Sequence, residues 1–228
     1  MTLASCDSRK TAGENPFFTE WDTPHGVPPF DKILPEHFMP AFERGMSLHE
    51  AEIDAITSNK DEATFENTIL AYDNAGQMLA QTELVFGMLC AAETNDRMQA
   101  LQEQAMPLLA AHRDKIRLDD KLFVRVKEVY DRRAALGLDA EQMRLLQKTY
   151  DSFVRAGALL DAEQKARLKE INGQLSLTAV KFGNNILAEN NNFVLELKSD
   201  ELDGLPAGIR DAAREKAQQM GKGDKWVF

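Results

Sequence analysis

Apolar residues recur every three or four positions through most of this chain, and that spacing restricts what it can fold into. Phe38, Phe42 and Met46 begin the pattern after a proline-rich opening from Pro24 to Pro35. Residues three and four apart share one face of an α-helix, so each such run predicts an amphipathic helix with one buried stripe. The predicted fold class is mainly α, a bundle-like layer of long helices.

Side chains that can accept a hydrogen bond from a free amide predict where the helices begin. The first helix is expected from near Pro35 to Thr57. The expected caps of the later helices are Thr64, Thr94 or Asn95, Asp119 or Asp120, Asp139 and Asp161. The last two have glutamine three residues later, which is the spacing of a capping box. Four further long helices are thus expected after the one that Thr64 opens.

The sequence also predicts where these helices continue and where they are interrupted. Residues 65–90 are expected to form one long helix, with Leu79, Leu84 and Leu89 among its core candidates. Pro107 should bend or divide the third helix, because proline removes a backbone donor. Gly137 should end the fourth with a positive φ.

The hydrophobic period changes near Asn190. The last long helix carries its apolar positions at mixed three- and four-residue steps, at Leu168, Ile171, Leu175, Phe182 and Ile186. Beyond it, residues 193–197 predict a strand, Leu205-Pro206 opens a short helix, and residues 226–228 begin another strand. The expected organisation is a disordered start over 1–14, a helical domain over 15–190, and over 191–228 the beginning of a mixed α/β region. We expect its terminal strand to lack a partner.

The negative net charge of the chain disfavours anionic binding partners. The chain has 37 acidic and 27 basic residues, a net charge of −10, which disfavours nucleic acids and anionic lipid headgroups. Neutral or basic peptides remain acceptable. No apolar run approaches the roughly 18 residues of a membrane span.

The two cysteines are too few for a disulfide framework. Leu3-Ala4-Ser5-Cys6 has the form of a bacterial lipobox, in which Cys6 would be the point of lipid attachment and the polar stretch after it a tether. Only two residues precede that pattern, whereas a signal peptide needs roughly 7–15 apolar residues. Two interpretations of Cys6 stay open: an acylated cysteine after a trimmed leader, or a bystander thiol.

Several stretches together resemble the amino-terminal part of the peptidyl-dipeptidases of the thimet oligopeptidase family of zinc metallopeptidases. They are Asn15-Pro16-Phe17-Phe18, residues 23–33, residues 64–69, residues 153–158, residues 165–172 and residues 205–226. The resemblance covers nearly everything after Asn15. It implies a neurolysin-like helical region that forms a wall over a deep channel, admitting short peptides and excluding folded proteins.

Chemistry in that family resides on an H-E-x-x-H helix, where two imidazoles hold zinc and the glutamate activates water. This chain has His49-Glu50, but Ile53 occupies the position of the second histidine. No catalytic or metal-binding residue is therefore carried over. The resemblance implies zinc in the parent enzyme, none bound by this chain, and a missing carboxyl-terminal catalytic domain as partner. We expect the chain to be the front piece of a longer enzyme and inactive alone.

The remaining histidines are His25, His37 and His112, too scattered to predict a replacement site. A structural role near a helix end is expected for His37 and His112, and a solvated helix surface for His49 and Glu52. Neither Cys6 nor Cys90 has a context that would activate a thiol. The alternative function is a free-standing helical module that binds peptides or a partner. A bacterial protein is expected, in the periplasm or membrane-anchored if Cys6 is acylated and otherwise cytoplasmic.

Overall fold

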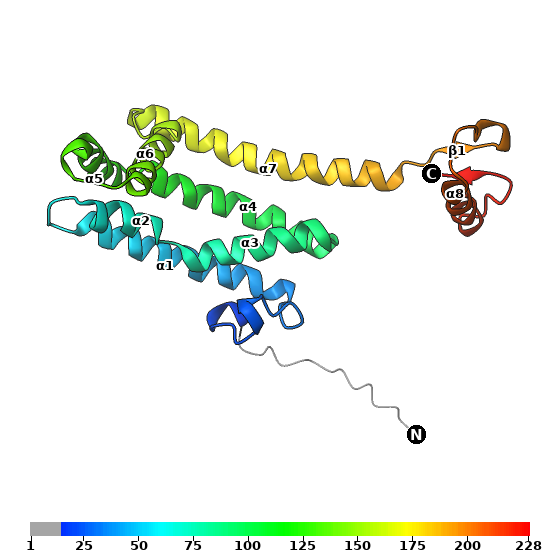
Figure 1. Ribbon diagram of the computed structural model, residues 1–228, viewed down its shortest axis with the longest axis horizontal. Helices are drawn as coiled ribbons and strands as arrows, with labels where there is room; N and C mark the ends of the chain where they lie inside the picture. Colours follow the sequence, from blue (N-terminus) through cyan, green and yellow to red (C-terminus); the bar gives the residue numbers. More distant parts are fainter. Residues whose placement is uncertain (1–14) are drawn as a thin grey trace, which may run out of the picture. The chain divides into compact units, whose positions relative to one another are not determined.

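The computed structural model describes residues 15–228, and the chain divides into two compact units, residues 1–180 and 181–228. Most of the described residues are helical, which confirms the predicted fold class (Figure 1). The helices are α1 (Phe38–Ser58), α2 (Ala71–Asp73), α3 (Gln77–Ala92), α4 (Asp96–Arg117), α5 (Asp120–Asp131), α6 (Ala140–Arg155), α7 (Ala162–Asn192) and α8 (Ala207–Gln219). The predicted point of lipid attachment, Cys6, lies outside the described residues.

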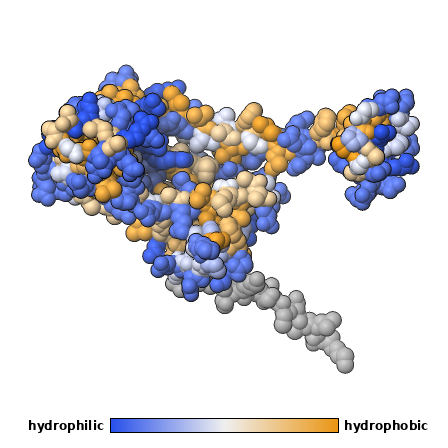
Figure 2. Space-filling view, in the orientation of Figure 1, coloured by the Kyte–Doolittle hydropathy of each residue, from blue (hydrophilic) through white to orange (hydrophobic). Residues whose placement is uncertain are grey.

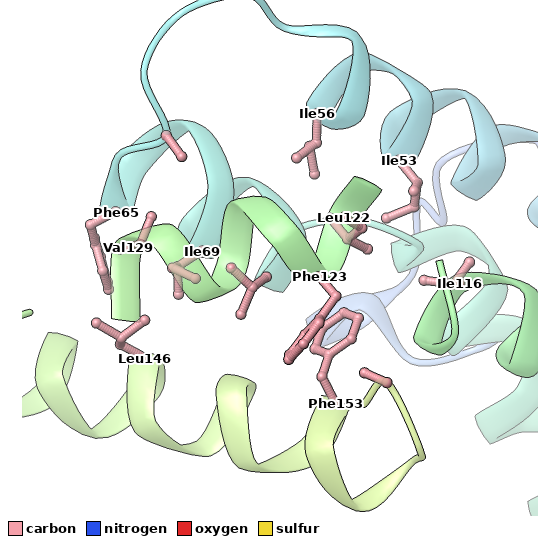
Figure 3. Packing of buried hydrophobic residues seen from close by; sticks show 13 residues of the cluster. Ile53, Ile56, Phe65, Ile69, Ile116, Leu122, Phe123, Val129, Leu146 and Phe153 are labelled. Carbon is pink, nitrogen blue, oxygen red and sulfur yellow. The ribbon is translucent and has the colours of Figure 1, made fainter. Parts of the chain in front are cut away.

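Within the first unit, α1 is the central element. It packs along α3 and also contacts α4 and α5, while α5 packs on α6 (Figure 1). Two groups of buried apolar side chains fill the spaces between these helices. The first core lies among α1, α5 and α6 and is drawn in Figure 3; it includes Ile56, Ile69, Leu122, Val126, Val129, Leu146 and Phe153.

The second core explains the opening motif as a structural one. Asn15 accepts a hydrogen bond from the amide of Phe17 and donates through Nδ2 to the carbonyl of His37 at 2.9 Å. These bonds place the buried Phe17 ring 5.3 Å from that of Phe38, which in turn packs on Phe86. The segment before α1 is thereby fixed on α1 and α3.

The predicted helix over 65–90 is wrong as a single element. Thr64 caps it as expected, accepting from the amide of Asn67, but residues 65–70 form a π-helix that runs into the short α2. A turn follows at Gly76, whose φ of +74° favours glycine. A Cβ there would lie 2.8 Å from Nδ1 of His49, so both the backbone conformation and the packing favour glycine at this turn.

Two other interruptions are only partly as expected. Pro107 does not divide the third helix, since α4 continues through it to Arg117, and the expected bend there stays a prediction. Gly137 does adopt a positive φ of 64°, but α5 has already ended at Asp131, and a 3-10 turn separates the two. The expected caps are confirmed at Asn95, Asp119, Asp139 and Asp161, whose carboxylate or amide oxygens accept from helix amides.

Arg125 is a buried cation in the first core that the sequence pattern did not reveal. Its Nη1 donates to the carbonyls of Asn59 and Asp61 at 3.0 and 3.2 Å, and its Nη2 donates to Oδ1 of Asn67 at 3.1 Å. One α5 side chain therefore holds the loop after α1 to the start of the π-helix.

Helix α7 differs from the others in what it buries. Only Lys165 and Val180 are buried along its length, and its apolar positions Ile171 and Leu175 are 42% and 62% exposed. Leu84 on α3, a core candidate, is also exposed at 66%. The helical period was read correctly in both places, but period alone does not say whether a neighbouring element covers the stripe.

The second unit contains the end of α7, β1 (Glu196–Leu197), α8 and β2 (Trp226–Val227). The strands are shorter than predicted and pair with each other in antiparallel register, Glu196 opposite Val227. The expectation that the terminal strand lacks a partner is therefore wrong. Lys222 and Lys225 both pair with Glu196, which lowers the pKa of that carboxyl to about 2 through hydrogen bonds from the two ammonium groups.

Candidate functional site

The fold brings together two histidines that are 63 residues apart. His49 on α1 and His112 on α4 meet between these helices, with 3.1 Å between Nδ1 of His49 and Nε2 of His112. His112 is buried and His49 half-buried, so the predicted solvated surface around His49 is wrong. Sequence spacing could not reveal this pair, because it depends on how α1 and α4 pack.

Charged groups flank the pair on both sides. Glu50 places Oε1 3.5 Å from Nδ1 of His112 and pairs through Oε2 with Lys115 at 2.8 Å. Glu52 accepts a hydrogen bond from the amide of Gly76 at 2.7 Å. The lysine holds the pKa of Glu50 below its ordinary value, chiefly by donating a hydrogen bond to the carboxylate.

These neighbours favour one arrangement of protons. If His49 donates from Nδ1 to Nε2 of His112, then Nδ1 of His112 carries the proton that faces the Glu50 carboxylate. The opposite tautomer would turn a lone pair toward that carboxylate. Burial lowers the pKa of both histidines, and the positive charge that His112 can carry lowers that of His49 further. The pair is therefore neutral near pH 7 and joins α1 to α4 as a hydrogen bond.

The same region does not have the residues of a zinc peptidase centre. Ile53, in the place where H-E-x-x-H needs its second histidine, is buried in the first core (Figure 3). Across residues 15–228 no group of three or more histidine, cysteine, aspartate or glutamate side chains is placed to hold a metal ion. The described residues thus do not fit the zinc that the family resemblance implies, and no reaction step is assigned to them.

The other candidate residues have local roles. His37 accepts a hydrogen bond at Nδ1 from the amide of Leu34, in agreement with its predicted structural role. His25 is exposed, with a positive φ in a short turn. Cys90 is half-buried, and burial raises its thiol pKa, which disfavours the nucleophilic thiolate. Cys6, the predicted point of lipid attachment, lies outside the described residues.

Exposed apolar side chains are the other notable feature, and both units have them. In the first unit they include Ile171 and Leu175 on α7, and in the second Phe182, Ile186 and Phe193. Phe182 and Phe193 are 66% and 64% exposed, which is unusual for such large apolar side chains. Figure 2 shows hydrophobic residues on the surface along the segment drawn as α7 in Figure 1.

Comparison with known proteins finds relatives over most of the chain. The chain is 38% identical to the dipeptidyl carboxypeptidase of Escherichia coli over 215 aligned residues. These residues make up 94% of this chain. It is related to the thimet oligopeptidase family. The dipeptidyl carboxypeptidase of Salmonella typhimurium is 36% identical over the same length, and the oligopeptidase A of Escherichia coli is 24% identical over 197 residues.

The extent of these matches is as informative as their identity. The chain spans about a third of the length of the curated relatives it matches, 32% of each dipeptidyl carboxypeptidase. No protein-family model matches it. Its identity is higher to the dipeptidyl carboxypeptidases than to oligopeptidase A.

The relatives and the helices also bear on location. The relatives named above are bacterial. Among residues 15–228, no helix combines the length and the apolar composition needed to cross a membrane. Attachment through Cys6 and a place in the periplasm stay predictions.

Proposed function

We propose that this chain is the helical part of a zinc metallopeptidase that releases dipeptides from the carboxyl end of short peptides. The carrying observation is the 38% identity to a dipeptidyl carboxypeptidase over 94% of this chain and only 32% of that protein. In this proposal, zinc and the catalytic side chains come from the polypeptide outside these 228 residues. The parent is a peptidase, and this portion is inactive alone.

The helices of the first unit restrict access to the active-site channel in this proposal. A wall of long, packed helices is rigid, because each helix is held by side chains from several others. A narrow entrance then selects substrates by steric exclusion, admitting extended short peptides and rejecting folded proteins. The two described cores and the Asn15 to Phe38 contacts support a rigid wall.

The exposed apolar side chains support a missing partner. Large apolar side chains at Leu175 and Phe182 favour burial against another surface, which the catalytic part of the polypeptide would supply. The same observation favours the alternative function, a helical module that binds peptides or a partner without catalysis. We place that second, because exposed apolar surface does not specify its occupant.

The test compares the 228-residue chain with the longest polypeptide that its coding region encodes. Each is incubated with a short peptide that has a free carboxyl terminus and with the same peptide amidated there, and the products are identified by mass spectrometry. We expect the longer polypeptide to release dipeptides from the free peptide, to spare the amidated one, and to contain zinc. We expect the 228-residue chain to do none of these. Cleavage by the short chain, or internal cleavage of both peptides by the long one, would contradict the proposal.

A further inference from the structure

A basic pocket lies on the first unit, and neither histidine of the pair lines it. It has a volume of about 480 Å³ and is lined by Arg117 at the end of α4 and by Arg144, Lys148, Asp151, Ser152, Arg155 and Ala156 of α6 and its cap. Four cations and one carboxylate therefore surround one hollow on a chain whose net charge is −10. The surplus of positive charge is local.

The helical period places three of these cations in one row. Arg144, Lys148 and Arg155 are four and seven residues apart on α6. At 3.6 residues per turn they lie within about 40° of one another and extend along about 16 Å of the helix. Arg117 joins them from a different helix. Figure 2 shows strongly hydrophilic residues over the region where Figure 1 draws α6.

Structural roles account for only part of this row. Arg117 and Arg155 lie in the last turns of α4 and α6, where a cation stabilises the helix dipole. Arg117 also faces the hydroxyl of Tyr72, whose pKa is raised mainly by burial and lowered in part by this guanidinium. Arg144 and Lys148 lie before the last turn of α6, where the dipole gives a cation no advantage.

The α6 cations have no carboxylate partner among residues 15–228. None of Arg144, Lys148 and Arg155 is in an ion pair there, although exposed cations elsewhere, such as Lys115 and Lys127, are. Asp151, the one acidic side chain in the pocket, instead accepts a hydrogen bond from Nε2 of Gln147 at 2.9 Å. Within the described chain the pocket therefore keeps a surplus of positive charge, four cations against one carboxylate.

We propose that this pocket binds a small anion that carries several phosphate groups. Guanidinium groups bind phosphate oxygens through two parallel hydrogen bonds, so an arginine-rich hollow suits that chemistry. Ala156 is the one apolar residue in the lining, so the four cationic groups are the feature of this pocket that would select a ligand. A compact, highly charged molecule uses such a pocket better than a peptide does. This site does not depend on the proposed peptidase role.

The test measures binding of inorganic tripolyphosphate to the 228-residue chain by calorimetry at low salt. We expect Arg144→Gln with Lys148→Gln to weaken binding about tenfold or more, because two charge-assisted contacts are lost. Asp151→Asn should tighten binding, since it removes the one carboxylate. The matched control is Lys169→Gln with Lys181→Gln, two exposed lysines on α7 with the same change in charge, which should leave the affinity nearly unchanged.

Three results would overturn the proposal. They are absence of tripolyphosphate binding by the unmodified chain, equal weakening in the α6 and α7 double variants, and tighter binding of a tetraglutamate peptide than of tripolyphosphate. The last would assign the pocket to acidic peptides instead. All substituted side chains except Asp151 are exposed, and circular dichroism checks that each variant is folded. Should the α6 double variant not fold, Asp151→Asn tests the proposal alone through the direction of its effect.

Discussion

Helices α6 and α7 follow one another in the chain and begin in the same way, yet they lie in different environments. Each starts with a capping box. The aspartate side chain accepts a hydrogen bond from the backbone amide of a glutamine three residues later, and the glutamine side chain accepts one from the backbone amide of the aspartate. Helix α6 then buries Leu146 and Phe153 completely in the first core. Helix α7 leaves Leu175 mostly exposed.

The difference shows what an amphipathic pattern specifies. The pattern fixes which residues share a face, but an element must be present to cover that face. Helix α6 has α5 and the π-helix as neighbours, whereas α7 takes part in none of the extensive helix pairings of the described chain. Its contacts with the rest of the first unit include the pairing of Lys165 with Asp120 and a hydrogen bond of 2.9 Å from Asn172 to Asp114. We infer that α7 has the features of an interface helix and α6 those of a core helix.

The largest expected effect comes from truncating the same residue type on each helix. Leu146→Ala should lower the free energy of unfolding by about 2–5 kcal/mol, because it leaves a cavity in a packed core. Leu175→Ala should change it by less than about 0.5 kcal/mol, since that side chain is already in water and alanine favours helix. Chemical denaturation of both variants measures the difference. Equal losses would mean that α7 is covered in solution.

The next effect tests whether the buried cation of α5 belongs to the packed region. Arg125→Met should cost about 1–3 kcal/mol, because the carbonyls of Asn59 and Asp61 and the side chain of Asn67 lose their donor. Arg144→Met, which changes an exposed arginine without an ion pair in the described chain, is the matched control. It should be nearly neutral in the same denaturation experiment. A neutral Arg125→Met would show that water replaces the lost donors.

These contrasts also indicate which features could be predicted from the sequence. Caps and periods are local, so the sequence predicts the caps at Asp139 and Asp161 and narrows a third to Asp119 or Asp120, of which Asp119 is the cap. The break at Gly76 was not predicted, and the close approach of the His49 ring, which leaves no room for a Cβ there, depends on packing between helices. Burial of Arg125 and the meeting of His49 with His112 depend on contacts more than fifty residues apart. The row formed by Arg144, Lys148 and Arg155 did have a sequence signal, its helical spacing, but charge on a helix is usually a solvated face.

A smaller effect compares the two capping boxes directly. Asp139→Ala should lower the global free energy of unfolding by about 1 kcal/mol, since α6 forms part of the core. Asp161→Ala removes an equivalent bond, but α7 can fray at its start without opening that core. We expect faster amide hydrogen exchange in the first turns of α7 and a smaller global loss. Equal global losses would indicate that α7 unfolds together with the rest of the first unit.

The smallest expected change concerns the pH dependence of the packed region, through the histidine pair between α1 and α4. Burial lowers the pKa of His49 and of His112 in the folded chain below the ordinary value of 6.5. At pH values between the lowered pKa and 6.5, the unfolded chain therefore binds more protons than the folded one. Stability therefore rises with pH through this window and falls as the pH drops below about 6.5. Protonating both rings would also set two N–H groups against each other across 3.1 Å. His112→Gln should flatten that pH dependence in denaturation measured at several pH values, whereas His25→Gln, at an exposed turn, should leave it unchanged. If the two variants keep the same slope, the pair does not couple protonation to the packing of α1 on α4.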